Sequence, residues 1–182
     1  CAPFGTQRRD VLWQLAALDR RPGTLFARSQ MQEGNALPIS PLPAMTPLEA
    51  TLSDYASMGL TTGPHVMAHL SPELHARRVL ASADVRHATH GRYVRVAGHV
   101  IVRQRPGTAK GMLFLTLEDE TGTCNVAVRP DVFRMHRRLL HTARVLCIGG
   151  PVQSVDGVVH VLGRTFEELA LAGTAPPSHD FH

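Results

Sequence analysis

Near Gly91 the hydrophobic pattern of the chain changes its period, and this change limits the folds that the sequence can adopt. Beyond this residue apolar side chains recur at every second position, which is typical of β-strands that bury one face. Tyr93–Val102 carries valines at alternate positions, and Met112–Glu118 carries leucines in the same way. The second half of the chain is therefore predicted to form a β-sheet.

Three more strands and one helix are predicted after these two. The run Glu118–Thr123 is a turn that leads into the third strand, and Asp156-Gly157 is a pair typical of type I′ hairpins between the last two. A proline at position 130 suits the first turn of a helix. The predicted strands are 124–128, 144–155 and 158–165, and the predicted helix is 131–140.

The order strand, strand, strand, helix, strand, strand over residues 91–165 is that of the OB-fold, a five-stranded Greek-key barrel. OB-folds often hold single-stranded nucleic acid on their second and third strands and on the loops beside them. The predicted fold class is therefore mixed α and β, with a small helical connector followed by a five-stranded OB-fold β-barrel.

Patterns outside the barrel predict the remaining segments. Arg8–Leu18 places apolar residues on one helical face, and Thr46–Glu49 is a capping box that begins another helix. The predicted segments are a terminal helix of a preceding domain (1–19), a Pro/Gly-rich linker (20–45), a helical connector (46–90), the OB-fold domain (91–165), and a short helix at 166–171 with a C-terminal tail (166–182).

Composition narrows the class of protein. The 182 residues are 43% hydrophobic and 19% charged, which argues against disorder. No apolar run approaches the roughly 18 residues of a membrane span, and charges near the start argue against a signal peptide. We therefore expect a cytoplasmic chain that does not contact a membrane. The three cysteines form no CxxC pair, and we expect Cys124 and Cys147 to be small buried apolar side chains.

Several stretches of the sequence resemble a known family. RQRPGTAKG (103–111) is followed by LTLEDETG (115–122), and LSDYASMGLTTGPHVMAHL (52–70), DGVVHVLGR (156–164) and the terminal SHDFH (178–182) add to the match. These stretches resemble the C-terminal region of bacterial error-prone DNA polymerases of the C-family, paralogues of the replicative polymerase III alpha subunit. The resemblance implies a parent several times longer that copies damaged DNA with divalent metal (Mg²⁺) in a catalytic domain upstream of Cys1.

The residues here indicate binding and no catalysis. The net charge of +4 permits phosphate contact, and the predicted loop between the first two strands carries Arg103, Arg105 and Lys110. Phe114 is expected to face outward on the second strand and to stack on a base, with Asn125 opposite. The alternatives are a solubilising hairpin tip for the loop and packing against the connector or another domain for Phe114.

The helix at 131–140 adds a second basic area. Arg134, Arg137 and Arg138 are spaced to share one helical face, and Arg129 precedes them, so they can guide template DNA or form an ordinary solvated face. The acidic run Glu118–Glu120 is interpreted as a solvated hairpin. His65 and His69 are interpreted as solvated or capping residues, so neither a metal site nor a cofactor is predicted in this chain.

Two segments are candidates for protein partners by resemblance. Leu25 and Phe26 lie where C-family polymerases carry a clamp-binding peptide, although Pro22 stands about where a Gln is usual. Phe181 is the apolar residue of the tail, which the resemblance assigns to mutagenesis accessory proteins, including an inactive Y-family polymerase paralogue. The alternatives are packing onto a neighbouring domain for Leu25-Phe26 and a frayed end for the tail.

The prediction is the C-terminal part of an error-prone DNA-directed DNA polymerase used in damage-induced mutagenesis and translesion synthesis. This part is expected to bind single-stranded template and partner proteins. The alternative is a freestanding OB-fold protein that binds single-stranded nucleic acid and has no enzymatic activity. A third possibility is a docking module whose groove is filled by protein.

Overall fold

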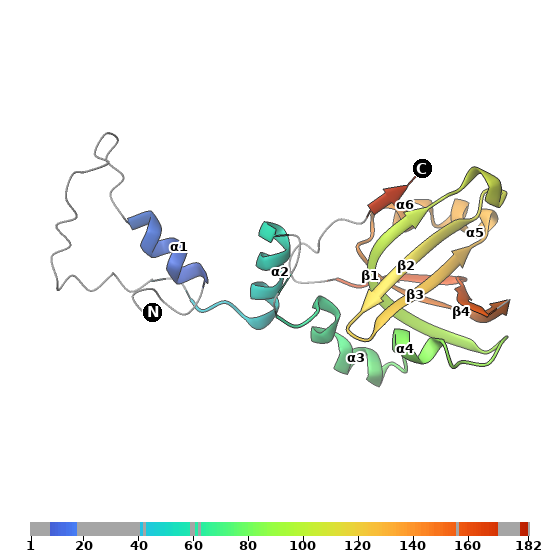
Figure 1. Cartoon of the computed structure of the whole chain (residues 1–182), viewed down its shortest axis with the longest axis horizontal. Coiled ribbons are helices and arrows are strands. Elements are labelled where there is room, and N and C mark those ends of the chain that lie inside the picture. The colour runs from blue at the N-terminus through green and yellow to red at the C-terminus, as the bar shows by residue number, and fades with distance from the viewer. Residues whose placement is uncertain are drawn as a thin grey trace. The chain divides into compact units, whose positions relative to one another are not determined.

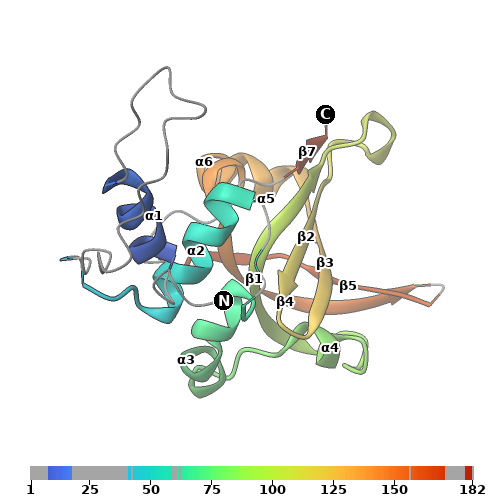
Figure 2. The ribbon, with the colours of Figure 1, turned by 60° about the vertical axis from the view of Figure 1, so that its left-hand side comes forward.

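The strands after residue 92 close into a barrel, which confirms the predicted OB-fold (Figures 1 and 2). The barrel strands are β1 (Tyr93–Gln104), β2 (Leu113–Asp119), β3 (Gly122–Val128), β4 (Val145–Val155) and β5 (Val158–Leu162). They are hydrogen-bonded in the order β4-β5-β3-β2-β1, and β1 also pairs with β4, so the sheet closes on itself. Barrel neighbours are antiparallel except β3 and β5.

The computed structural model describes residues 8–17, 41, 43–58, 61, 63–155, 157–170 and 179–181. The chain divides into two units, residues 1–47 and 48–182. The first unit contains α1 (Arg8–Ala17), in which the Arg9 guanidinium donates a hydrogen bond of 3.1 Å to the Pro43 carbonyl. Most of the predicted linker lies outside the described residues. In the described ranges, no helix combines the length and apolarity needed to cross a membrane.

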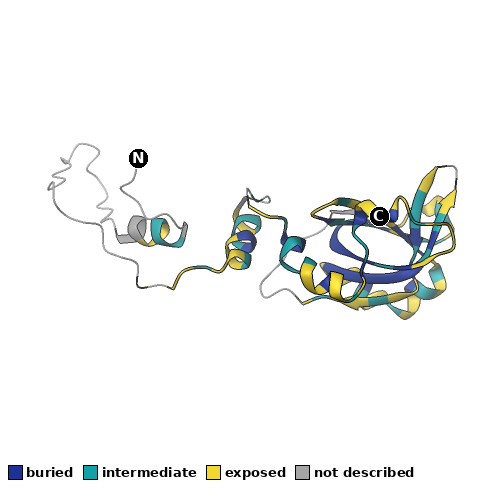
Figure 3. Ribbon diagram, turned by 90° about the horizontal axis from the view of Figure 1, so that it is seen from below, coloured by how far each residue is buried: buried dark blue, intermediate teal, exposed yellow. Residues whose placement is uncertain are grey.

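Alternating residues of the strands fill the main core. Leu113, Leu115 and Leu117 of β2 all point into the barrel, as their spacing predicts, and are at most 3% exposed. Ile148 on β4 and Val161 on β5 meet them from the other side of the barrel. Figure 3 shows the buried residues gathered along the strands. Burying each side chain of this size stabilises the fold by about 1.5–3 kcal/mol.

The long strand β1 pairs with two neighbouring strands and contains a bulge. Tyr93–His99 pairs with β4 on one edge, and His99–Gln104 pairs with β2 on the other. The register shifts between Val100 and Val102, so one extra residue enters β1 there. A bulge bends the strand, which helps to close the barrel, and it also exchanges the inward and outward positions beyond it.

Short helices cover one end of the barrel. They are α2 (Pro47–Met58), η1 (Val66–His69), α3 (Ser71–Ala76) and α4 (Ser82–Val85). Leu52, Met67 and Leu74 form a second apolar cluster with Ala97 of β1 and Cys147 of β4. The outer face of β1 is therefore buried at this end. α2 matches the helix predicted to begin at the Thr46–Glu49 capping box.

Three predicted features of the C-terminal half were wrong or incomplete. The helix predicted over 131–140 is two short helices, α5 (Pro130–Met135) and α6 (Arg137–Thr142), because the chain breaks at His136. The helix predicted at 166–171 begins instead as β6 (Thr165–Glu168), which pairs with β4. The tail contributes β7 (His179–Phe181). In total, seven strands form one sheet in the described part of the chain.

Both interior cysteines are buried free thiols, as predicted. Cys124 is 4% exposed on β3 and Cys147 is 3% exposed on β4. Burial raises the pKa of Cys124 to about 12 and also raises the pKa of Cys147. Because only the thiolate is a good nucleophile or metal ligand, both residues act as apolar packing groups at neutral pH.

Candidate nucleic-acid interface

The outer face of β1, β2 and β3 has one open end and one covered end. At the open end Phe114 is 38% exposed, and Gln104 and Asn125 are exposed as well. At the covered end His99 is only 5% exposed, and the His65 ring of the connector lies 3.5 Å from the Glu118 carboxylate. The open end is the part of this face that a ligand can reach.

Strand register fixes the rows of side chains at the open end. Phe114 lies between Gln104 on β1 and Ala127 on β3. Asn125, expected opposite Phe114, lies opposite Thr116 in the next row, and the Thr116 hydroxyl donates a hydrogen bond of 3.2 Å to its side-chain oxygen. This arrangement offers one exposed aromatic ring and a neighbouring amide, which suits base stacking with polar contact beside it.

Sequence reasoning did not single out Gln104 for this face. Thr116 alternates with the buried leucines of β2 as Phe114 does, so the sequence places it beside Phe114 on this face.

 The position of Gln104 depends on the β1 bulge, for which the sequence carries no clear signal. Both residues border Phe114 or Asn125, so they belong to the same candidate surface.

The β1–β2 loop brings two of the predicted cations to the edge of this surface. The loop contains η2 (Gly107–Ala109), and both Arg105 and Lys110 are exposed on it. The Arg105 guanidinium lies 4.9 Å from the centre of the Phe133 ring on α5, a cation–π contact that holds the loop against the helix. Because both side chains are exposed, their charges remain accessible to phosphates.

Arg103 was wrongly assigned to this basic loop. It lies on β1 and is only 6% exposed. Its Nε donates a hydrogen bond of 2.9 Å to the Leu140 carbonyl, and another guanidinium nitrogen donates to the Ala143 carbonyl. These carbonyls belong to the C-terminal end of α6, so Arg103 fixes the helix to the barrel instead of facing DNA.

The predicted basic helix does not form one continuous basic face. Arg129, Arg134 and Arg137 are all exposed, but the break at His136 separates Arg134 on α5 from Arg137 on α6. The continuous helical spacing that would place Arg134, Arg137 and Arg138 on one face is therefore absent. The Arg129 guanidinium also pairs with the Asp131 carboxylate at 3.3 Å, which reduces its local charge. This area is a secondary candidate for phosphate contact.

The acidic run Glu118–Glu120 lies at the end of β2, and its central residue, Asp119, is buried, although the run was interpreted as solvated. Asp119 is 8% exposed, and its carboxylate accepts hydrogen bonds from the backbone N–H groups of Ser82 at 2.7 Å and Thr121 at 2.7 Å. The Thr121 hydroxyl and the Gly122 N–H donate to it as well. Asp119 thus ties α4 to the β2–β3 hairpin.

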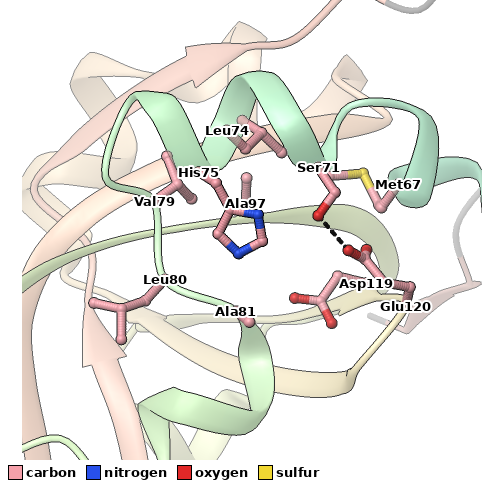
Figure 4. Close-up of a pocket in the computed structure, with 10 residues that line it drawn as sticks. All are labelled: Met67, Ser71, Leu74, His75, Val79, Leu80, Ala81, Ala97, Asp119 and Glu120. Carbon is pink, nitrogen blue, oxygen red and sulfur yellow. Dashed lines mark hydrogen bonds between the residues drawn. The ribbon is translucent and has the colours of Figure 1, made fainter.

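A small pocket beside this turn does not fit a metal ion or a nucleotide. Its volume is about 20 Å³, and Ser71 and Glu120 are hydrogen-bonded to each other at its edge (Figure 4). A space of this size holds about one water molecule. The oxygen atoms of Asp119 accept hydrogen bonds from the protein, so they do not fit a Mg²⁺ ligand set.

The two connector histidines are engaged in local hydrogen bonds. His65 Nδ1 accepts from the Met67 N–H at 3.2 Å, and His69 Nε2 lies 3.1 Å from the Thr51 hydroxyl. Among the residues that the structure describes, no group of three His, Cys, Asp or Glu side chains could hold a metal ion.

The predicted partner-binding residues are only partly covered by the structure. Leu25 and Phe26 lie outside the described residues, so their assignment to a clamp stays a prediction. Phe181 lies on β7, whose backbone pairs in parallel with β1. Residues 179–181 of the tail therefore form a strand of the sheet.

Comparisons with known proteins agree with the OB-fold of the barrel. Residues 85–169 match the family described as "OB-fold nucleic acid binding domain". The chain is 39% identical to an error-prone DNA polymerase of Burkholderia pseudomallei over 100% of its length, and 42% identical to one of Pseudomonas fluorescens over 93%. It covers only 17% and 16% of those proteins, respectively.

Solved structures show more distant similarity. An asparaginyl-tRNA synthetase from Pyrococcus horikoshii superimposes with a TM-score of 0.44 at 22% identity, over 52% of this chain and 24% of that one. The chain therefore contains an OB-fold domain and is similar, over nearly its whole length, to one part of the error-prone DNA polymerases.

Proposed function

We propose that the chain is the C-terminal part of a bacterial error-prone DNA polymerase and that its OB-fold domain holds single-stranded template DNA. The observation that carries the proposal is the open end of the β1–β3 face, where Phe114 is exposed beside Asn125 and next to the cationic β1–β2 loop. An aromatic ring can stack on any base, and nearby cations neutralise phosphates without selecting sequence. Such a surface suits a polymerase that must accept any template.

The proposal extends to the longer protein that the relatives represent. The polymerase reaction and its Mg²⁺ would belong to a catalytic domain outside the 182 residues, because the described residues offer no fitting acidic cluster. Resemblance to the family supports synthesis across damaged template in the cytoplasm. It also supports contact with a sliding clamp through Leu25 and Phe26, and with mutagenesis accessory proteins, including an inactive Y-family polymerase paralogue, near the C-terminal end.

Replacing the exposed ring tests the stacking role. Phe114→Ala should weaken binding of a fluorescent single-stranded oligonucleotide by about 5- to 150-fold, because a stacked base contributes about 1–3 kcal/mol. Phe114 is exposed, so the barrel should remain folded, and circular dichroism checks this. Unchanged affinity in a folded variant would remove the β2 face from the site.

A charge-matched pair of variants tests the loop. Arg105→Gln with Lys110→Gln should reduce the slope of log K against log salt by about 1.4, since each phosphate contact on a single strand contributes about 0.7. Arg86→Gln with Arg92→Gln is the control, because these arginines are also exposed but lie away from the loop. Equal slopes for the two double variants would mean that only net charge matters, which contradicts a loop site.

A further inference from the structure

The C-terminal segment extends the open face by one strand. β7 pairs in parallel with Val102–Gln104 of β1, and Figure 1 shows it beside β1. β4 pairs with the same edge of β1 only as far as His99. β7 therefore continues along this edge after β4 has ended, and it satisfies backbone groups that would otherwise form an open sheet edge.

The register of β7 places its residues in the rows already described. Gln104 is the partner of Phe114 on β2 and of Phe181 on β7. Residues in register on neighbouring strands occupy the same face of a sheet. Phe181 therefore takes a position on the same face as Phe114, in the same row and about 10 Å away, since neighbouring strands are about 4.8 Å apart.

Charge favours this register of β7 on β1 over registers shifted by one residue. Asp180 takes the position opposite Arg103, the buried arginine of β1. Opposite charges at paired positions stabilise a strand pair. A slip of one residue would move Asp180 to the open face and Phe181 to the opposite face of the sheet. The sequence of the tail thus specifies which face receives the aromatic residue.

We propose that Phe181 is a second stacking residue for single-stranded DNA, so that the C-terminal strand completes the surface that Phe114 begins. The inference rests on the proposed function of the OB-fold domain. An OB-fold engages about 4–16 nucleotides, and Phe114 alone provides a ring for one base. A second aromatic position in the same row, beyond the polar Gln104, gives the surface a site for another base of the same strand.

Substitutions that keep the strand but change the ring test this role. Phe181→Leu keeps an apolar residue and should weaken single-strand binding by at least about fivefold, while Phe181→Tyr should bind about as well as the parent chain. Tyr93→Leu is the control, because Tyr93 is an exposed aromatic at the other end of β1, and it should leave the affinity unchanged. Equal affinity for Phe181→Leu and the parent chain would overturn the inference.

A fluorescent reporter makes the contact visible directly. The chain has one tryptophan, Trp13, so Trp13→Phe removes the background signal. In that background Phe181→Trp should lose fluorescence when oligothymidylate is added, because a stacked base quenches indole emission. Tyr93→Trp in the same background should not respond. An unresponsive Phe181→Trp in a chain that still binds DNA would assign the tail to a protein partner and overturn the inference.

The two proposals fail in different ways. If Phe114→Ala weakens binding and Phe181→Leu does not, the OB-fold face binds DNA but the tail does not take part. If neither substitution changes the affinity, the proposed function of this face is itself wrong. Loss of affinity in both variants, with Tyr93→Leu unaffected, is the result expected here.

Discussion

Among single residues, Asp119 shows how a carboxylate at the end of a strand can stabilise the fold. Burial opposes its ionisation, but hydrogen bonds from Thr121 and Ser82 outweigh this effect, so its pKa lies below the usual value. A carboxylate whose pKa is lower in the folded state stabilises that state at neutral pH. This contribution is lost as the pH falls below about 4, the value of an unfolded Asp, and on toward the folded pKa.

The first prediction concerns this residue. Asp119→Asn should lower the free energy of unfolding at pH 7 by about 1–3 kcal/mol. Both carboxylate oxygens accept hydrogen bonds from backbone N–H groups, and the amide NH₂ would place a second donor against one of these groups. The loss should shrink as the pH falls from about 4 toward the lower pKa of the folded carboxyl, below which the native carboxyl is itself protonated. Urea unfolding at several pH values measures both effects.

Asp84→Asn is the matched control for this measurement. Asp84 is exposed on α4, the same short helix whose first residue, Ser82, donates to Asp119. Its replacement should change the free energy of unfolding by no more than about 0.5 kcal/mol at either pH. Equal effects of the two substitutions would show that Asp119 has no special role at the hairpin.

Among the elements, the strands were predictable because their side chains alternate between a buried and an open face. β2 shows this directly, with its three leucines inward and Phe114 outward. The alternation of β1 could not be followed to its end, since the bulge between Val100 and Val102 reverses it. This reversal turns Arg103 inward and Gln104 outward, so one of the predicted cations proved buried and one residue of the open face was missed.

β6 was missed for a different reason. Its sequence, Thr165-Phe166-Glu167-Glu168, is followed by Leu and Ala, and such residues favour helix locally. Tertiary contacts stabilise the strand instead. Phe166 packs on His136 with ring centres 5.0 Å apart. The Glu167 carboxylate forms ion pairs with Arg77 and, at 3.2 Å, with Arg95. These partners are distant in sequence, so no local pattern could have revealed them.

The prediction at this scale concerns the crossing of β4 and β5. A Cβ atom added at Gly150 would lie 1.9 Å from the Leu162 carbonyl oxygen, so a side chain requires the two strands to move apart. Gly150→Ala should therefore lower the free energy of unfolding by about 1–3 kcal/mol or more. Gly107→Ala is the control, since nothing lies within 4 Å of its added Cβ. Thermal unfolding should separate the two variants, and equal midpoints would contradict this close approach.

For the molecule as a whole, the two units differ in how much apolar packing each contains. Both apolar clusters belong to the second unit, with buried members that run from Leu52 to Val161. In the described part of the first unit, Leu12 and Trp13 of α1 remain 57% and 40% exposed. Because buried apolar surface is the main source of stability, the second unit should fold without the first.

A shortened chain that begins at Pro43 tests this at the scale of the molecule. It keeps Thr46 and all of α2, and its free energy of unfolding should equal that of the full chain within about 0.5 kcal/mol. Its affinity for single-stranded DNA should change by less than about threefold, because Phe114, Asn125 and the β1–β2 loop all belong to the second unit. Equilibrium unfolding and fluorescence anisotropy measure the two quantities. A loss of more than about 1 kcal/mol would mean that the first unit packs on the barrel and stabilises it, and a large loss of affinity in a stable shortened chain would place part of the DNA site before Pro43.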